Sequence, residues 1–236
     1  DLQIELAEEV ASEINASGGR AKAAKIDVTD FAAMEHLVQQ TVERTGRLDY
    51  MFNNAGIAIG GNVSHFGIDD WNHIIDVNLR GVVNGIQAAY KVMISQGFGH
   101  IVNTASMAGL MCSPGAVAYA TTKYALVGLS KSLRAEAAQM GVRISVLCPG
   151  VVRTPILENG GRHGRLRAFL PPEEQHLLWD HLRPMDADAF ANRALDAVAR
   201  NRAVVVVPSW WRAVRFLNAV SPRLADSIID EVATPF

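Results

Sequence analysis

The 236-residue sequence has little of what marks several specialised classes of protein. Its two cysteines, Cys112 and Cys148, make no disulfide framework and have no metal-ligand spacing, so we expect no metal site. A formal net charge of −2 gives no electrostatic basis for binding nucleic acid or an anionic membrane. No apolar run approaches the length of a membrane span, and no signal peptide is visible. Because the few thiols fit a reducing compartment, we expect a cytoplasmic protein.

The sequence also lacks internal repeats, low-complexity tracts and any G-x-G-x-x-G motif, and it begins at Asp1 rather than at a methionine. What is present is the composition of an ordinary soluble globular protein, 49% hydrophobic and 19% charged. A chain of this length can bury a substantial core within one large domain. We therefore expect residues 1–236 to form a single domain.

Helical periodicity alternates along the chain with short apolar runs. The periodicity predicts helices at about 1–16, 30–45, 69–96, 116–140 and 186–200, and a further amphipathic helix after Ser209. The apolar runs predict strands at 21–28, 48–52, 100–104, 143–148 and 203–207. Such alternation is typical of an α/β fold, a doubly wound (Rossmann-like) parallel sheet with helices on both faces. The Pro- and Gly-containing segment 155–184 is expected to be a mobile, partly helical excursion.

The stretch from Ser106 to Lys123 carries the strongest chemical signal. It follows a predicted strand and enters a helix through the turn Pro114-Gly115. Tyr119 and Lys123 are four residues apart and therefore share a face of that helix. An ammonium beside a phenol lowers the pKa of the phenol, and a nearby serine would complete a set suited to general acid–base work. The alternative is a packed ring beside a solvated ammonium, which is a common arrangement.

Polar motifs follow three of the predicted strands. Asn53-Asn54-Ala55-Gly56, Ser106 and Pro149-Gly150 each come just after a strand, and ligands bind at this edge of an open parallel sheet. Asn78 lies inside the apolar stripe of the helix at 69–96, where a buried amide must find hydrogen-bond partners. The alternative for Asn78 is a purely structural bond to backbone.

With these motifs the chain resembles the short-chain dehydrogenase/reductase family. The resemblance rests on N-N-A-G at 53–56, Asn78, Ser106 ahead of Y-x-x-x-K at 119–123, and P-G-x-x-x-T at 149–154. These motifs stand in the family's order and near its spacings, and the match runs from about residue 20 to about residue 155. The resemblance implies NAD(H) or NADP(H) as cofactor and hydride transfer between an alcohol and a carbonyl.

The resemblance also implies a role for each matching residue. Tyr119 would be the acid/base, Lys123 would lower its pKa and hold the nicotinamide ribose hydroxyls, and Ser106 would hydrogen-bond the substrate carbonyl. Asn78 would position a water that links Lys123 to solvent. Cofactor contacts would come from Asp27 and Val28 at the adenine, from Asn53, Ala55 and Gly56 on the cofactor floor, from Pro149 and Gly150, and from Val152 and Thr154 at the nicotinamide carboxamide.

The chain departs from the family pattern at its amino end. The family has a Gly-rich T-G-x-x-x-G-x-G turn between two strands, whose backbone amides bind the pyrophosphate, and none occurs here. We therefore expect a first strand, a Gly-rich turn and a second strand to be missing before Asp1. The residue that selects between NAD and NADP lies at the end of that missing strand, so the choice stays open, and the position of Asp1 favours NAD.

The remaining expectations concern substrate and partners. Apolar residues around the site suggest a hydrophobic alcohol or ketone, although core packing would use the same residues: Met107, Leu110, Met111, Ile156, Leu157, Phe169 and Leu170. The spacings of His163, His176 and His181 match no metal motif. The aromatic and basic residues after Ser209 could lie on a membrane interface, but packing on the protein or across a subunit contact is favoured.

Two further points follow from the resemblance. It implies a homodimer or homotetramer built on the helices near 69–96 and 116–139. The main alternative function is a non-catalytic NAD(P)-binding sensor or scaffold of the same fold. A third possibility is epimerisation or dehydration with a tightly held cofactor.

Overall fold

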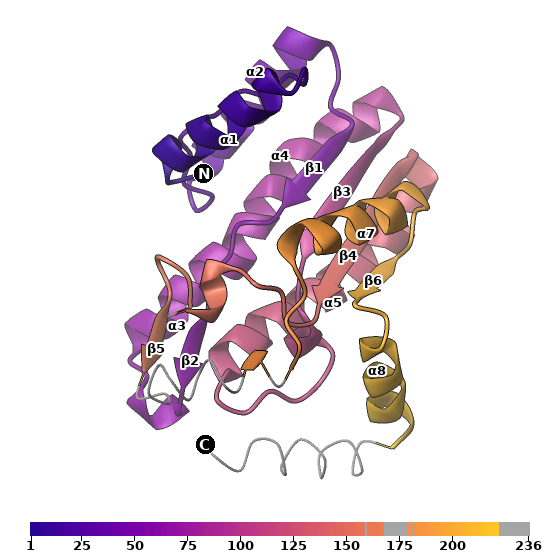
Figure 1. Ribbon diagram of the computed structural model, residues 1–236. Coiled ribbons are helices and arrows are strands. Elements are labelled where there is room, and N and C mark those ends of the chain that lie inside the picture. Colours follow the sequence, from indigo (N-terminus) through magenta and orange to yellow (C-terminus); the bar gives the residue numbers. More distant parts are fainter. Residues whose placement is uncertain (159, 168–178, 181, 222–236) are drawn as a thin grey trace.

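The computed structural model describes residues 1–158, 160–167, 179–180 and 182–221, which form an α/β fold around a parallel sheet (Figure 1). The main sheet has four strands in the order β1-β3-β4-β6, and a second, two-stranded sheet pairs β2 with β5. The strands are β1 Tyr50–Asn53, β2 Ile59–Gly61, β3 Gly99–Thr104, β4 Val142–Pro149, β5 Arg165–Arg167 and β6 Val204–Val207. The helices are α1 Ile4–Ala16, α2 Phe31–Thr45, α3 Ile68–Ile75, α4 Gly81–Gln96, α5 Val117–Ala137, α7 Ala187–Ala199 and α8 Trp211–Val220.

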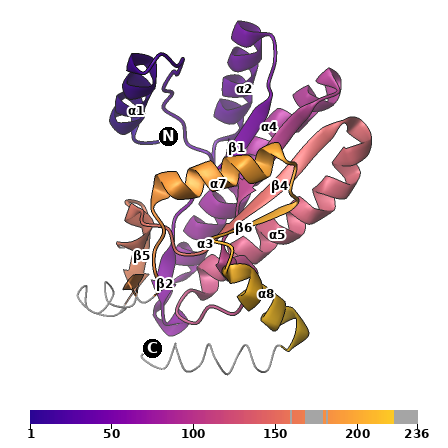
Figure 2. The same ribbon diagram turned by 45° about the vertical axis from the view of Figure 1, so that its right-hand side comes forward.

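Alternate residues of the strands pack on opposite faces of the main sheet, as the period of a strand requires. One face joins a large apolar cluster that includes side chains of α4 and α5, and its strand residues are Ile101, Ile144, Val146 and Val206. The other face packs against Ala194 and Val198 of α7, and its strand residues are Val102, Leu147, Val205 and Val207. Figure 2 shows α7 on one side of β4 and β6 and α5 on the other. The predicted sheet with helices on both faces is confirmed.

The helix predicted at 69–96 is present but has an irregular turn in its middle. α3 leads into a π-helical segment, Asp76–Arg80, which leads directly into α4. A π-helical turn inserts one extra residue into the helix and is frequent at functional sites. Asn78 lies within this segment. The helix predicted at 116–140 is α5 followed by a 3₁₀ turn, Ala138–Met140.

The strand predicted at 21–28 is wrong. These residues form no ladder with any strand of the described ranges, and β1, at one edge of the main sheet, pairs only with β3 there. The backbone of the segment instead bonds to Asp1: Ile26 N donates to the Asp1 carbonyl at 3.1 Å, and the Asp1 amino group donates to the Ala24 carbonyl at 3.1 Å. The apolar alternation is therefore present, but a strand also needs a neighbour for its N–H and C=O groups.

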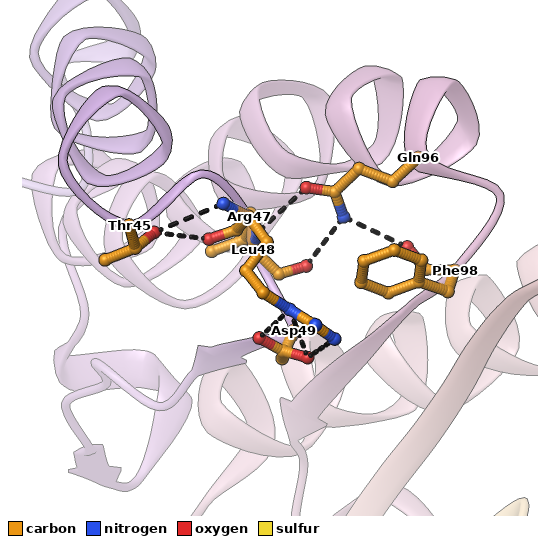
Figure 3. A network of polar contacts seen from close by, with 6 residues as sticks. All are labelled: Thr45, Arg47, Leu48, Asp49, Gln96 and Phe98. Carbon is orange, nitrogen blue, oxygen red and sulfur yellow. Dashed lines mark hydrogen bonds and ion pairs between the residues drawn. The ribbon is translucent and has the colours of Figure 1, made fainter.

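A polar network fixes the entry of the chain into β1 (Figure 3). Gln96, at the end of α4, accepts a hydrogen bond from Leu48 N at 2.8 Å and donates to the Leu48 carbonyl at 3.0 Å. Its amide also donates to the Phe98 carbonyl at 3.2 Å, and the Arg47 guanidinium lies over the Phe98 ring while pairing with Asp49. One amide side chain thus joins the start of β1 to the turn before β3.

The segment 155–184 is described only in part. It contains a 3₁₀ turn, Pro155–Leu157, and strand β5, which pairs in parallel with β2. Residue 159, residues 168–178 and residue 181 lie outside the described residues, as do residues 222–236 after α8. Within the described ranges, no helix combines the length and the apolar character needed to cross a membrane.

Candidate active site

The three polar motifs lie at one edge of the main sheet. β1, β3 and β4 are parallel, and their carboxyl ends are Asn53, Thr104 and Pro149. The register pairs Asn53 with Asn103 and Thr104 with Leu147, so the loops that follow these strands emerge side by side. This is the edge at which open parallel sheets bind ligands.

The first of these loops is fastened by asparagine side chains. Asn53 is buried and donates to Asn103 Oδ1 at 2.8 Å, and Asn103 donates in turn to Ser130 Oγ of α5 at 2.9 Å. Gly85 of α4 permits this, because a Cβ there would lie 1.9 Å from Asn53 Oδ1. The Asn53 side chain is thus directed into the protein. Ala55 and Gly56, in contrast, are exposed.

Asn78 connects that loop to two helices. Its Oδ1 accepts from Ile57 N at 2.8 Å, and its Nδ2 donates to the Ile57 carbonyl at 2.9 Å and to Thr122 Oγ1 at 3.2 Å. Both N–H groups of the amide are therefore used within the protein. The Asn78 side chain therefore has no N–H group left to donate to a water, and a water held by Asn78 would donate to an Asn78 oxygen instead.

Lys123 is buried beneath the same loop. Lys123 is 4% exposed, and its Nζ donates a hydrogen bond to the Thr104 carbonyl at 2.9 Å. A Cβ on Gly56 would lie 3.5 Å from Lys123 Nζ and 3.4 Å from Asn78 Oδ1, so the Gly56 backbone lies close to both groups. Burial lowers the pKa of Lys123 to about 8, and the Cys148 thiol nearby acts in the opposite direction.

Tyr119 lies one turn before Lys123 on α5. The Lys123 ammonium is 5.3 Å from the centre of the Tyr119 ring. Burial raises the pKa of Tyr119, and a hydrogen bond with the Ser106 side chain acts in the opposite direction. Burial is thus the largest influence on this pKa, and the lowering by the Lys123 ammonium stays a prediction. The phenol is neutral near pH 7 and can donate a proton.

Ser106 begins the loop after β3. Its Oγ accepts from Ala108 N at 3.1 Å and so caps the 3₁₀ turn Met107–Gly109. A Cβ on Gly109 would lie 2.5 Å from the Lys123 carbonyl, so this turn packs directly on the backbone of α5. Ser106, Tyr119 and Lys123 are thus brought together by one loop and one helix. Gly85, Asn103 and Gly109 support the arrangement and were not anticipated, because their partners are distant in sequence.

The other residues expected at the cofactor are anchored in different ways. Asp27 accepts from Thr29 N at 2.9 Å and from Thr29 Oγ1 at 2.8 Å, and Asn84 of α4 donates to the Val28 carbonyl at 2.9 Å. After β4, Val152 forms a bridge to Met185, and the Thr154 hydroxyl donates to the Val152 carbonyl at 3.4 Å.

The apolar residues proposed for the substrate pocket divide into two groups. Met107 is buried in the large core cluster, and Leu110 and Met111 pack against it, so these residues contribute to the core. Ile156 and Leu157 are half-buried and belong to the 3₁₀ turn Pro155–Leu157. Phe169, Leu170, His176 and His181 lie outside the described residues. Across the ranges that are described, no cluster of His, Cys, Asp or Glu could hold a metal ion.

The family that this fold and site suggest is also found by comparison. The family model described as short chain dehydrogenase matches residues 1–163. The chain belongs to the short-chain dehydrogenase/reductase family. It is 42% identical over 156 residues to oxidoreductase UcpA of Salmonella typhimurium, covering 66% of this chain and 59% of that protein. The chain thus spans about three fifths of the length of this relative.

Solved structures agree with this membership. A short chain dehydrogenase/reductase from Burkholderia phymatum in complex with NAD has a TM-score of 0.82 and 27% identity, over 95% of this chain and 84% of that one. A gluconate 5-dehydrogenase from Burkholderia cenocepacia in complex with NADP and tartrate has a TM-score of 0.63 and 33% identity, over 66% of this chain and 61% of that one. Structural neighbours thus bind either nicotinamide dinucleotide.

Proposed function

We propose that the protein is an NAD(P)-dependent oxidoreductase that interconverts a secondary alcohol and a ketone, with Tyr119 as the acid/base. The observation that carries the proposal is the convergence of a phenol, a buried ammonium and a hydroxyl at the ligand-binding edge of the sheet. Both NAD and NADP occur in similar structures, so either cofactor is compatible. A hydrophobic substrate is the proposed class, supported by the half-buried Ile156 and Leu157 after β4.

The residues around Lys123 fit the nicotinamide ribose of such a cofactor, whereas the Gly-rich turn that binds the pyrophosphate in this family does not occur in the sequence. An ammonium has three N–H groups, and among the described residues Lys123 uses one of them, on the Thr104 carbonyl. A buried cation needs further acceptors, and the ribose hydroxyls of the cofactor are suitable ones. The exposed Gly56 lies beside Lys123, and Gly150, Val152 and Thr154 would hold the nicotinamide end. When bound, the nicotinamide accepts or supplies the hydride.

The proton steps belong to the protein. In the reducing direction the Tyr119 hydroxyl donates its proton to the carbonyl oxygen, while Ser106 donates a hydrogen bond that orients that oxygen. In the oxidising direction Tyr119 must first lose its proton. Because burial raises the pKa of Tyr119, we expect ketone reduction to be favoured near pH 7 and alcohol oxidation to accelerate as the pH rises.

The test compares two tyrosines of α5 in the full-length protein. Tyr119→Phe should lower kcat by about 10²- to 10⁴-fold, the usual contribution of a positioned general acid. The matched control is Tyr124→Phe, at a residue 46% exposed on the same helix, which should keep wild-type turnover. Turnover of 2-octanol, cyclohexanol and gluconate is followed at 340 nm, and binding of NADH and NADPH by titration.

Two outcomes would contradict the proposal. Unchanged turnover in Tyr119→Phe would remove Tyr119 from the chemistry. Tight NADH binding with no turnover on a broad panel would instead favour the sensor or scaffold.

We propose further that the protein is a cytoplasmic homodimer or homotetramer built on α4 and α5. Two large apolar side chains on these helices that are exposed in the single chain support the interface: Ile94 (38%) and Val117 (42%). In such an assembly these side chains would be covered by the neighbouring subunit. Sedimentation that finds only monomers would refute the oligomer.

A further inference from the structure

Helix α8 contacts the loop after β4 at its first residue. Trp211 is 8% exposed, and a Cβ on Gly150 would lie 2.1 Å from Trp211 Nε1. The indole thus rests directly on the backbone of the Pro149-Gly150 turn, which is where β4 ends at the site. Any side chain at Gly150 would displace the turn or the helix.

Two helical turns later the same helix contacts the loop after β3. Asn218 Nδ2 donates to the Leu110 carbonyl at 3.1 Å. Leu110 immediately follows the 3₁₀ turn that Ser106 caps. Because Trp211 and Asn218 are seven residues apart, they share one face of α8, and this face therefore spans both loops.

The residues between them continue that face. Val214 packs on the apolar cluster that contains Trp211, and the Arg215 charge acts on the thiol of Cys148, the residue before Pro149. The opposite face is open, since Phe216 is 70% and Val220 is 66% exposed. α8 is thus attached to the protein along the face that touches the two loops of the site.

We propose that α8 is a strap that fixes the distance between the Ser106 loop and the Pro149-Gly150 turn, with Trp211 and Asn218 as positioning residues. The inference rests on the proposed function, in which Ser106 orients the substrate oxygen and the turn holds the nicotinamide end. A small displacement of one loop relative to the other would misalign the reacting groups without removing any of them. Misplacement by about 1 Å can lower a rate by up to about 10²-fold.

The contact of Trp211 with Gly150 is one of packing, whereas that of Asn218 with Leu110 is a hydrogen bond, so each can be removed by its own substitution. Within the described part of the chain, Trp211 Nε1 is buried without a hydrogen-bond partner, so the indole acts through its shape. Trp211→Phe should therefore keep most of the effect, whereas Trp211→Ala removes the contact. Asn218→Ala removes the donor to Leu110 and leaves the helix otherwise intact. Arg212→Ala, on an exposed position of the same helix, is the control.

The experiment uses the full-length protein and two readouts. The first is amide hydrogen exchange of residues 106–111, which should accelerate in Asn218→Ala and Trp211→Ala but not in Arg212→Ala or Trp211→Phe. The second is turnover of the fastest alcohol among 2-octanol, cyclohexanol and gluconate. We expect kcat to fall about 10-fold in Asn218→Ala while KM and the Kd for NADH stay within about two-fold, since alignment and not binding is lost.

Each failure has a distinct signature. Unchanged exchange at residues 106–111 in Asn218→Ala overturns the strap, whatever the activity. Faster exchange with unchanged kcat, or a KM that rises in proportion, overturns its positioning role. If the wild-type protein binds NADH but turns over none of the three alcohols, the proposed function is overturned, and the positioning role with it. Hydrogen exchange then tests only whether α8 holds the Ser106 loop in place.

Discussion

Helices α1 and α5 both carry apolar stripes, yet they are held very differently. α1 has no buried residue, and Leu6 and Val10 on its stripe are 51% and 54% exposed. α5 buries Leu126 completely, at 0% exposure, and presents Tyr119 and Lys123 from the same packed helix. In Figures 1 and 2, α1 lies away from the main sheet, whereas α5 lies against it. An apolar stripe thus predicts a helix, but burial depends on what lies beside it.

The difference arises from the strand ladder. α5 packs on β3 and β4, whose backbones pair along all of β3, while the residues after α1 form no ladder in the described ranges. The two regions meet between α1, which buries no residue, and α2, which buries Met34 and Val38 in the large core cluster. Substitutions matched across this boundary can measure how far the cooperative unit extends.

The largest expected contrast in stability is between two leucines. Leu126→Ala should lower the free energy of unfolding by about 3 to 5 kcal/mol, because it leaves a cavity in a fully packed core. Leu6→Ala should change it by less than about 0.5 kcal/mol, since the side chain is half exposed and alanine favours helix. Urea denaturation followed by circular dichroism measures both values. Equal losses would mean that α1 is part of the same packed core.

The next contrast is between two histidines under acid conditions. His100 is 3% exposed, shares a hydrogen bond with Ser145 Oγ, and burial lowers its pKa to about 4. Because the unfolded chain then binds the proton more readily between about pH 6.5 and pH 4, stability falls as the pH drops through that window, by up to about 3 kcal/mol.

His100→Gln should therefore flatten the acid slope of stability. The control is His36→Gln at an exposed position of α2, which should keep the wild-type slope. Urea midpoints between pH 7 and pH 4.5 give the comparison. Identical slopes in all three proteins would show that protonation of His100 does not control the acid response.

Several features of the site could be predicted because they depend on local spacing. Tyr119 and Lys123 share a helix face because they are four residues apart. Polar motifs that follow three parallel strands must lie together at the carboxyl edge of the sheet. The polar partners that Asn78 requires were also foreseeable from its place in an apolar stripe, although their identity, Ile57 and Thr122, was not.

Other features depend on contacts between distant segments. The inward direction of Asn53 follows from its pairing with Asn103 and from the missing side chain at Gly85, which only the register reveals. The direction of the Tyr119 pKa follows from burial outweighing nearby groups, and spacing gives no measure of burial. The prediction of a strand at 21–28 was wrong for the same reason, because a strand needs a second segment to pair with.

The smallest contrast can locate the boundary between the two regions. Asp30 caps α2 by accepting from Ala33 N at 3.0 Å, and Asp186 caps α7 by accepting from Ala189 N at 2.9 Å. Loss of such a cap costs about 1 kcal/mol, while Asn in place of Asp preserves it. α2 buries Met34 and Val38 in the large core cluster, which α1 does not reach.

We therefore expect Asp30→Ala and Asp186→Ala each to lower the free energy of unfolding by about 1 kcal/mol, with Asp30→Asn and Asp186→Asn close to the wild type. Urea denaturation and hydrogen exchange in α2 provide the measurements. If Asp30→Ala accelerated exchange in α2 without moving the urea midpoint, α2 would open separately from the sheet. The boundary of the cooperative unit would then lie at Leu48, where Gln96 holds the chain, instead of between α1 and α2.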